Sequence, residues 1–442
     1  LLTRERLFER VLLRGLSRDD VGRFIEVTSG VNPPPSLVDT VYAQTEGSPL
    51  FVTEVVRLLV QEGQLTPDRT SSRETWTLRI PEGVREVIGR RLNRLSARCN
   101  EALTVASVIG REFNISHLSP LMDDLSSDRL LDVLEEGLEA RVIEELPTGI
   151  GLYQFTHALI HETLLDELTL TRRVRLHTRV AESLESLYGA NADDHAAELA
   201  YHFVQAEAVL GGEKIVHYSQ VAGDQALQNY AYEEALEQFE RAIASREDKP
   251  VDAQAANLYF GLAQAQTATI EAIQFDEVIP NLTRAFDFYE ETENVERAVA
   301  VAAHQFLGPP GLLADALDLT TRALKFTVAG SVESGHVLAR HGFILGREIG
   351  DYEQAIEALD DALSIARNHG ERALEARALY YSAHIEASHL KYRQCLEKSV
   401  EAQKLAREVG DTTLEAVVFG RPLPQCRRLG TRSAAERLRP TH

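Results

Sequence analysis

GDYEQAIEALDDALSIARNHGERALEA, residues 350–376, is the stretch of sequence that decides the fold. Its last part begins with Gly370-Glu371 and continues to Leu374-Glu375-Ala376. The same pattern recurs 40 residues later, as Gly410-Asp411 and Leu414-Glu415-Ala416. Self-similarity at a fixed period of 20–50 residues is typical of a repeat array, in which each unit buries its apolar face against the next. The stretch therefore predicts a solenoid of helices from about residue 211.

Earlier and later copies of the helix that opens this stretch support the prediction. Gly350-Asp351-Tyr352 is followed by Ala355 and Ala362, which is the pattern of the second helix of a tetratricopeptide repeat. The small residues allow paired helices to approach closely, and the aromatic residues fill the space between them. The spacing near 40 exceeds the roughly 34 residues of the simple repeat, so we expect some extended loops. The other copies are Tyr232…Ala235…Phe239…Ala242, Ala285, Ala316…Ala323 and a degenerate Tyr392…Cys395…Ala402.

Residues 80–170 have a different rhythm, with short helices followed by two strands. The apolar spacing predicts helices beginning at Pro81, after Ser96, near 115 and near Ser126. Residues 142–146 and 152–155 then read as strands, joined by the turn PTGIG at 147–151. Helices followed by a hairpin predict a winged helix, and long helices resume from about 157 to 208.

The first 64 residues predict a helical region. Ser17 is suited to cap a helix, and the prolines at 33–35 prevent that helix from continuing. A second helix is expected over about 37–45. Gly47 ends it, Ser48 can cap the next helix, and Pro49 fits the first helical position. A short strand at 76–78 is a further expectation.

Length and charge limit the classes of function. A chain of 442 residues suggests about three domains. The formal net charge of −22 disfavours broad nucleic-acid binding, because affinity for phosphate backbones comes from Lys and Arg. The expected helix at 126–140 carries five acidic residues against Arg129, so we expect it to pack against neighbouring domains and not to read a DNA groove.

The remaining composition indicates a cytoplasmic protein. No apolar run reaches the length of a membrane span, and no secretion signal is recognisable. The three cysteines are far apart, which fits a reducing compartment. The chain starts at Leu1 and its only methionine is Met122, so we expect it to be a fragment. The segment 421–442, with six arginines against one acidic residue, is expected to be a disordered or atypical tail.

Catalytic signatures are missing from the sequence. It contains no phosphate-binding G-x-x-x-x-G-K-[ST] loop, no G-x-S-x-G elbow and no H-E-x-x-H motif. His157 and His161 are four residues apart on an expected helix, but without further ligands a metal site is disfavoured. We therefore predict no catalytic residues and no metal ligands, and no self-contained enzyme.

Four segments carry a resemblance to a known family. TEGSPLFVTEV at 45–55 resembles the TEGNPLFVEEV segment of large bacterial signal-transducing ATPases, with Ser48 where Asn is commoner. PEGVREVI at 81–88, ASVIGREF at 106–113 and FTHALIHETL at 155–164 are similar to the winged-helix region of the same family. The matches occur in the family's order and, with the repeats, cover most of residues 1–420. The family includes large LuxR-type transcriptional regulators and multidomain adenylate/guanylate cyclases of the STAND and AAA type.

The resemblance implies roles for particular residues. In this family a Gly-x-Pro of the lid packs near the adenine, and the matching residues are Gly47, Ser48 and Pro49. A winged-helix histidine approaches the phosphates of bound ADP, and the matching residue is His157. Two simpler interpretations stay open: Ser48-Pro49 as a plain helix start, and His157 as a packed histidine at a strand-to-helix junction.

These observations define one main hypothesis and one alternative. The main hypothesis divides the chain into a helical lid (1–79) that follows a missing P-loop core, a winged helix with linking helices (80–210), tetratricopeptide-like repeats (211–420) and the tail (421–442). ATP or ADP would bind the intact protein, a P-loop ATPase, and not this fragment alone. The repeats would bind a protein or small-molecule inducer, with self-association on activation and no contact with membrane or nucleic acid. The alternative is a nucleotide-independent tetratricopeptide scaffold. A DNA-binding regulator acting through the winged helix is disfavoured by the acidity of residues 126–140.

Overall fold

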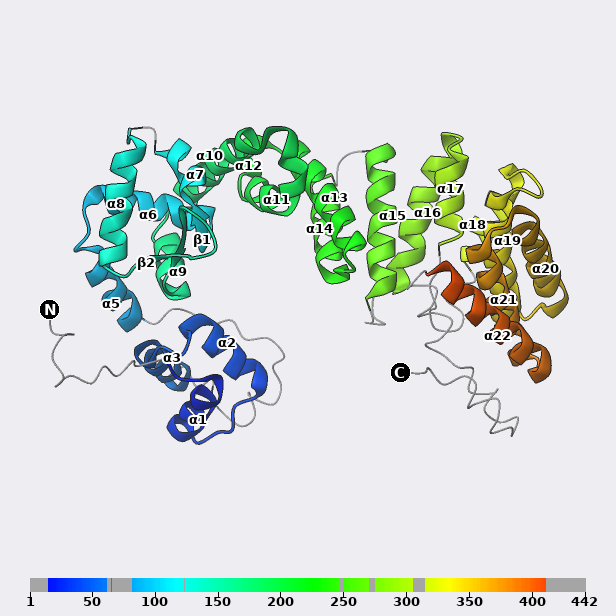
Figure 1. The fold of residues 1–442 in the computed structure, drawn as a ribbon, viewed down its shortest axis with the longest axis horizontal. Coiled ribbons are helices and arrows are strands. Elements are labelled where there is room, and N and C mark those ends of the chain that lie inside the picture. Colours follow the sequence, from blue (N-terminus) through cyan, green and yellow to red (C-terminus); the bar gives the residue numbers. More distant parts are fainter. Residues whose placement is uncertain are drawn as a thin grey trace. The chain divides into compact units, whose positions relative to one another are not determined.

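The chain folds into two compact units that divide between Gly211 and Gly212. The computed structural model describes residues 15–61, 65, 82–122, 124–246, 250–269, 275–304 and 315–410. Both units are built mainly of helices, as the sequence predicts (Figure 1). The expected strand at 76–78 and the expected tail at 421–442 lie outside the described residues.

Three helices form the start of the first unit: α1 (Arg18–Ser29), α2 (Pro35–Thr45) and α3 (Pro49–Gln61). Ser17 caps α1 as predicted, because its hydroxyl accepts the Asp20 N–H while the Asp20 carboxylate accepts the Ser17 N–H. α2 begins two residues before the predicted Leu37, since Pro35 occupies the first helical turn. The helices bury a common apolar core made of Val21, Ile25, Leu37, Val38, Val41, Val52, Val55, Val56 and Leu59.

Short helices and a small sheet make up the next part of this unit. The two predicted strands pair as a hairpin, and a third strand, β1, joins them in the antiparallel order β1-β3-β2. Strand β1 has no counterpart among the predicted elements, because three residues are too few to display an alternating pattern. The designation as a winged helix stays a prediction. The elements are α5 (Glu82–Leu92), α6 (Ala97–Ile109), β1 (Glu112–Asn114), α7 (Ile115–Leu118), η2 (Ser119–Leu121), α8 (Ser127–Glu139), β2 (Ile143–Glu145) and β3 (Leu152–Phe155).

The acidic helix α8 is held in this unit by both of its faces. Leu130 and Leu134 are buried on its apolar face. On the other side, the Glu136 carboxylate accepts hydrogen bonds from the backbone N–H and the hydroxyl of Ser96, the N-cap of α6. One acidic residue of this helix therefore has a structural role at the start of a neighbouring helix.

Five further helical segments complete the first unit. Two buried histidines meet there: the Nδ1 atoms of His177 on α10 and His202 on α11 are 3.0 Å apart. The segments are α9 (Ala158–Asp166), α10 (Leu170–Tyr188), η3 (Gly189–His195), α11 (Ala196–Gln205) and α12 (Glu207–Leu210).

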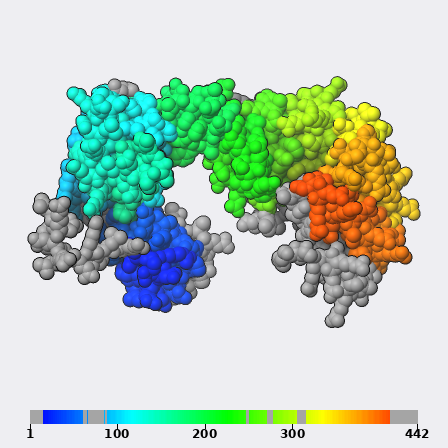
Figure 2. Space-filling model, in the orientation of Figure 1, coloured from blue at the N-terminus to red at the C-terminus, as the bar shows by residue number. Residues whose placement is uncertain are grey.

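The second unit is an α-solenoid in which helices that follow one another along the chain pack side by side (Figure 1). Coloured by residue number, its surface runs in bands from green to orange, so neighbours in sequence are neighbours in space (Figure 2). The helices are α13 (Glu213–Gln228), α14 (Tyr232–Ala244), α15 (Ala253–Ala268), α16 (Phe275–Glu291), α17 (Val295–Ala302), α18 (Ala316–Phe326), α19 (Val332–Ile344) with the π-helical turn η5 (Leu345–Ile349), α20 (Tyr352–His369), α21 (Arg372–Ser388) and α22 (Tyr392–Val409).

The repeat residues recognised in the sequence pack as expected. The buried ring of Phe239 on α14 fits between two glycines, and a Cβ atom would lie 2.8 Å from this ring at Gly223 and 2.5 Å from it at Gly261. These glycines lie on α13 and α15, so all three helices meet at one ring. The small repeat residues are also buried: Ala235, Ala242, Ala285, Ala316, Ala323, Ala355, Ala362, Cys395 and Ala402. The tyrosines of the pattern, Tyr232, Tyr352 and Tyr392, are half-buried.

Six turns among the described residues of the solenoid share one backbone feature. In each, a residue with positive φ is followed by an N-cap residue and then by the first residue of a helix. Three of these residues are glycine, the residue that adopts this conformation without steric cost: Gly330, Gly350 and Gly370, with φ angles of 82°, 80° and 74°. The other three are Tyr230, Glu293 and Leu390, with φ angles of 61°, 53° and 61°.

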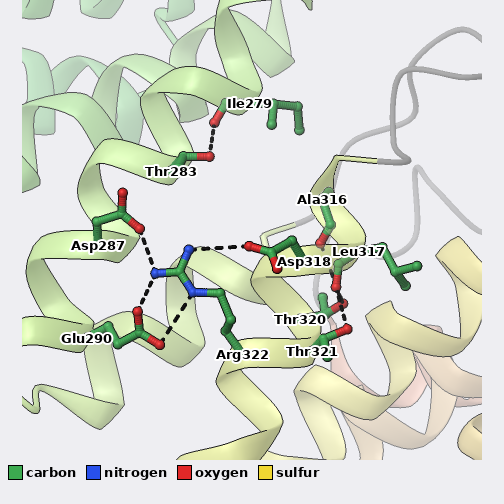
Figure 3. A network of polar contacts seen from close by, with 10 residues as sticks. All are labelled: Ile279, Thr283, Asp287, Glu290, Ala316, Leu317, Asp318, Thr320, Thr321 and Arg322. Carbon is green, nitrogen blue, oxygen red and sulfur yellow. Dashed lines mark hydrogen bonds and ion pairs between the residues drawn. The ribbon is translucent and has the colours of Figure 1, made fainter.

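Charged contacts tie α16 to α18. Arg322 on α18 points towards α16, where its guanidinium pairs with Asp287 at 2.6 Å and with Glu290 (Figure 3). Asp318, one turn earlier on α18, lies 3.3 Å away. The Arg322 guanidinium also stacks over the Phe286 ring, 4.8 Å from its centroid. In this cluster charge, as well as apolar packing, joins two helices of the array.

Within the part of the chain that the structure describes, no helix is both long enough and apolar enough to cross a membrane.

Candidate functional site

The turn between α2 and α3 places Glu46 and Gly47 in the left-handed region of backbone space. Their φ angles are 49° and 70°. The Gly47 carbonyl accepts the Leu16 N–H at 2.7 Å, and a Cβ atom on Gly47 would lie 2.0 Å from the Leu16 carbonyl oxygen. Only glycine fits there, because both the φ angle and the close approach of the Leu16 backbone exclude a side chain.

Ser48 and Pro49 continue this turn into α3. The Ser48 N–H donates to the Thr45 carbonyl at 2.8 Å, and the Ser48 carbonyl accepts the Val52 N–H. Ser48 is half-buried and Pro49, the first residue of α3, is exposed. Their local geometry is that of a helix start, and contact with an adenine stays a prediction for all three residues of the turn.

The Glu46 carboxylate reaches a distant part of the unit. It pairs with the guanidinium of Arg111, which directly precedes β1. It also accepts the backbone N–H of Ala158 at 3.4 Å, and its other oxygen lies 3.8 Å from Nδ1 of His157. The predicted turn and the predicted histidine are therefore brought to the same carboxylate. We call Glu46, Phe51, Arg111 and His157 the Glu46 cluster.

His157 lies at the N-cap position of α9, directly after β3. Its ring meets the buried ring of Phe51 edge-on, with centroids 5.2 Å apart. About 30% of the side chain is exposed, yet Nδ1 is buried and has no hydrogen-bond partner among the described residues. Nε of Arg111 is likewise buried and has no hydrogen-bond partner among the described residues. The cluster therefore contains two buried polar atoms that could bind a further group.

The ring of His157 is neutral near pH 7. Burial lowers its pKa below the ordinary value, the Glu46 carboxylate opposes this shift, and Arg91 and Arg111 add to it. A neutral imidazole can donate one hydrogen bond and accept another. The cluster thus offers Arg111 as a permanent cation and His157 as an adaptable partner.

His161, the second histidine of the i, i+4 pair, has a different role. Its Nε2 lies 2.8 Å from the Ser107 carbonyl on α6, and not in the Glu46 cluster. The ring therefore holds α9 against α6.

Sequence reasoning missed Glu46, Phe51 and Arg111 as members of the site. All three lie inside the segments that carry the family resemblance, at 45–55 and 106–113. The available signal was complementary charge: an acidic residue beside the lid glycine and an arginine beside the second segment. Nothing in their spacing indicates that they meet, since the pair is separated by 65 positions.

Comparisons with known proteins give the following likenesses. The chain matches no protein-family model. It is 25% identical over 210 residues to an uncharacterized protein of Rhizobium meliloti (strain 1021), a match that covers 47% of this chain and 20% of that protein. The chain thus spans about one-fifth of the length of this relative.

Two solved structures are similar at low scores. One is a Signal Transduction ATPase with Numerous Domains (STAND) with a tetratricopeptide repeat sensor from Pyrococcus horikoshii: 14% identity, a TM-score of 0.35, 96% of this chain and 65% of that chain. The other is a Rap protein complexed with Competence and Sporulation Factor: 15% identity, a TM-score of 0.37, 78% of this chain and 85% of that chain.

Proposed function

We propose that this chain is the regulatory and sensing portion of a nucleotide-dependent signalling protein. In this proposal the turn at Gly47, Ser48 and Pro49 and the ring of His157 close over ATP or ADP held by an ATPase core outside the chain. The observation that carries the proposal is the Glu46 cluster. Two segments singled out for nucleotide contact, 110 positions apart in the sequence, meet at one carboxylate.

The chemistry of the cluster fits a phosphate group. Nδ1 of His157 and Nε of Arg111 are buried and lack partners among the described residues. The backbone N–H of Ala158, at the start of α9, is held only by the long 3.4 Å contact with Glu46. Phosphate oxygens accept hydrogen bonds from arginine, imidazole and helix N-terminal N–H groups. A nucleotide would supply the negative charge that Glu46 now presents to these donors.

The repeats supply the input in this proposal. An array of helix pairs forms an extended surface suited to a protein or small-molecule inducer. Inducer binding would favour an open, self-associating form over a closed, ADP-bound form, as a population shift between two conformations. The output domain, a DNA-binding or a cyclase domain, would also lie outside the chain.

The alternative proposal is a nucleotide-independent tetratricopeptide scaffold. It is favoured by the packing of the second unit, which has its own continuous apolar core from α15 to α22. Such an array can bind a partner without any contribution from the Glu46 cluster. The two proposals differ in whether His157 affects nucleotide binding.

Release of a fluorescent ADP analogue from the full-length gene product tests the first proposal. We expect His157→Ala to accelerate release about ten- to a hundredfold, the effect of one lost hydrogen bond to a charged group. For His157→Gln, which keeps a hydrogen-bond donor, we expect a release rate between those of the wild-type protein and His157→Ala. The matched control is His117→Ala, because His117 is a half-buried histidine that packs against Tyr188.

Two results would contradict the proposal. Unchanged release from His157→Ala, with the protein folded by circular dichroism, would remove His157 from the nucleotide site. A full-length protein that binds neither ADP nor ATP would favour the scaffold.

A further inference from the structure

A second site is suggested by a pocket of about 620 Å³ in the first unit. It lies between α6, the residues after α7 and the N-terminal half of α10, and it shares no residue with the Glu46 cluster. Its volume is in the range of small-molecule sites. Its lining residues are Arg98, Glu101, Val105, Leu121, Met122, Asp124, Thr169, Thr171, Arg172, Arg175, Leu176 and Arg179.

Positive charge exceeds negative charge in the lining of the pocket. Arg98 is neutralised within the lining, since it pairs with Glu101 at 2.9 Å and with Asp124. The excess positive charge comes from α10. Between Leu168 and Ala181 this segment has no acidic residue, in a chain whose net charge is −22. The wall formed by α10 is therefore a local exception to the acidity of the chain.

Three arginines of α10 line the pocket because their spacing puts them on one helical face. Arg172, Arg175 and Arg179 are at positions i, i+3 and i+7. Arg179 is oriented by a 2.8 Å hydrogen bond from its guanidinium to the Leu121 carbonyl. Arg172 and Arg175 are exposed, and neither guanidinium has an ion-pair partner among the residues that the structure describes.

The rest of the lining is suited to the uncharged part of a ligand. The apolar part of the lining includes Val105, Leu121 and Met122, which are buried, and Leu176. Thr169 and Thr171 also line the pocket. Thr169 caps α10 through the Arg172 N–H, which fixes the start of the helix and the direction of its arginine face.

We propose that this pocket binds a small phosphorylated molecule, with the phosphate on Arg172 and Arg175 and the remainder over the apolar residues. Guanidinium groups form paired, parallel hydrogen bonds to phosphate oxygens, which lysine cannot do. Residues of α6 and of positions 121–124 line the pocket together with the arginine face, and this concave lining favours a compact ligand over a flat acidic protein surface. The site is independent of the proposed nucleotide contacts at His157.

Isothermal titration calorimetry of the 442-residue chain with pyrophosphate tests the proposal. We expect saturable binding with one site per chain. Arg172→Ala/Arg175→Ala should weaken it at least tenfold, since two charge-assisted hydrogen-bonding groups are lost. Arg172→Lys/Arg175→Lys keeps the charge but lacks the paired N–H groups of the guanidinium, so its affinity for pyrophosphate should decrease only a few-fold. Both positions are exposed, so the variants should fold, and circular dichroism checks this.

The matched control is Arg23→Ala/Arg129→Ala, which removes the same charge from exposed positions on α1 and α8. It should bind pyrophosphate within about twofold of the wild-type chain. Equal weakening in this control, or full binding by Arg172→Ala/Arg175→Ala, would overturn the proposal. His157→Ala should leave the affinity unchanged, so this result is separate from the outcome of the ADP experiment.

Further probes define the ligand class. A phosphorylated sugar should compete with pyrophosphate, because it places the same group on the arginines. Hexaglutamate should not compete. If hexaglutamate competes as well as the phosphorylated sugar, the arginine face binds acidic peptides, and the proposed small-molecule site is wrong.

Discussion

The two units of the chain differ in the contacts that hold each of them together internally. In the second unit, helices contact their neighbours in sequence, and one ring, Phe239, fills the notch left by two glycines. In the first unit, Glu46 contacts Arg111 and Ala158, which are 65 and 112 positions away. The comparison indicates that disturbances should stay local in the array and should spread between distant segments in the first unit.

The largest expected effect is in the array. Phe239→Ala removes a fully buried ring, and we expect it to lower the free energy of unfolding of the second unit by about 3–5 kcal/mol. Hydrogen exchange should show lost protection in α13, α14 and α15, decreasing along the array. Val400→Ala, at a 48% exposed position, is the control and should change little. Lost protection throughout the first unit would contradict the expectation that disturbances in the array stay local.

The next effect concerns the turn at the candidate site. Gly47→Ala combines an unfavourable φ with a clash against the Leu16 carbonyl, and we expect a loss of about 2–3 kcal/mol in the first unit. Gly30→Ala is the matched control, because Gly30 has a similar φ of 73° but nothing within 4 Å of its Cβ position. It should cost about 1 kcal/mol.

Hydrogen exchange sharpens this prediction. Gly47→Ala should reduce protection in β1 and in the first turn of α9, because Glu46 joins these segments. Equal costs for the two glycine variants would show that the approach of the Leu16 backbone is unimportant.

A separate effect, measured as a slope of stability against pH, is expected in the first unit. Burial lowers the pKa of His177 to about 4 and that of His202 to about 3. In the unfolded chain these two histidines take up protons below about pH 6.5, whereas in the folded first unit they stay neutral, so their contribution to stability falls as the pH decreases from 6.5 towards 4. Each histidine should contribute about 1.4 kcal/mol per pH unit. Urea unfolding at pH 7, 6 and 5 measures this slope.

The variant His177→Asn should make that slope shallower. The control His195→Asn, at a 44% exposed side chain, should keep the wild-type slope. A slope unchanged by His177→Asn would mean that this pair does not determine the acid sensitivity of the first unit.

The smallest effect tests the charged cluster in the array. Hydrogen bonds to Glu290, Asp287 and Asp318 raise the pKa of Arg322, so it stays charged. Because the partners are partly exposed, we expect Arg322→Gln to cost only about 1 kcal/mol, and less in 0.5 M salt. Arg393→Gln, at a 90% exposed side chain, should have no measurable effect. A larger loss that is independent of salt would show that packing on Phe286 dominates.

The contrast between local and long-range contacts also explains which parts of the structure could be predicted from the sequence. The solenoid could be predicted because its small and aromatic residues repeat locally, and Ala355 and Ala362 are buried as that pattern requires. Ser17 and the hairpin at 143–155 could be predicted for the same reason, since each depends on neighbours within a few residues. Strand β1 could not, because its three residues are defined by their partners on β3.

The candidate site was only partly predictable. Gly47 and His157 were found through the family resemblance, but their common partner Glu46 depends on the folded path of the chain. The pocket beside α10 was missed for a related reason. The spacing of Arg172, Arg175 and Arg179 is visible in the sequence, whereas the wall from α6 that faces them is not.

The six turns of the array that share a positive φ have a consequence for engineering. Tyr230, Glu293 and Leu390 adopt a conformation that Gly350 adopts without strain. The glycine turns of the array therefore suggest a substitution at the other three. Glycine at position 230, 293 or 390 should relieve a backbone strain of about 1 kcal/mol. The greater freedom of glycine in the unfolded chain offsets part of that gain. A thermostable version of this solenoid could therefore be built from its turns, with every helix face left free to bind.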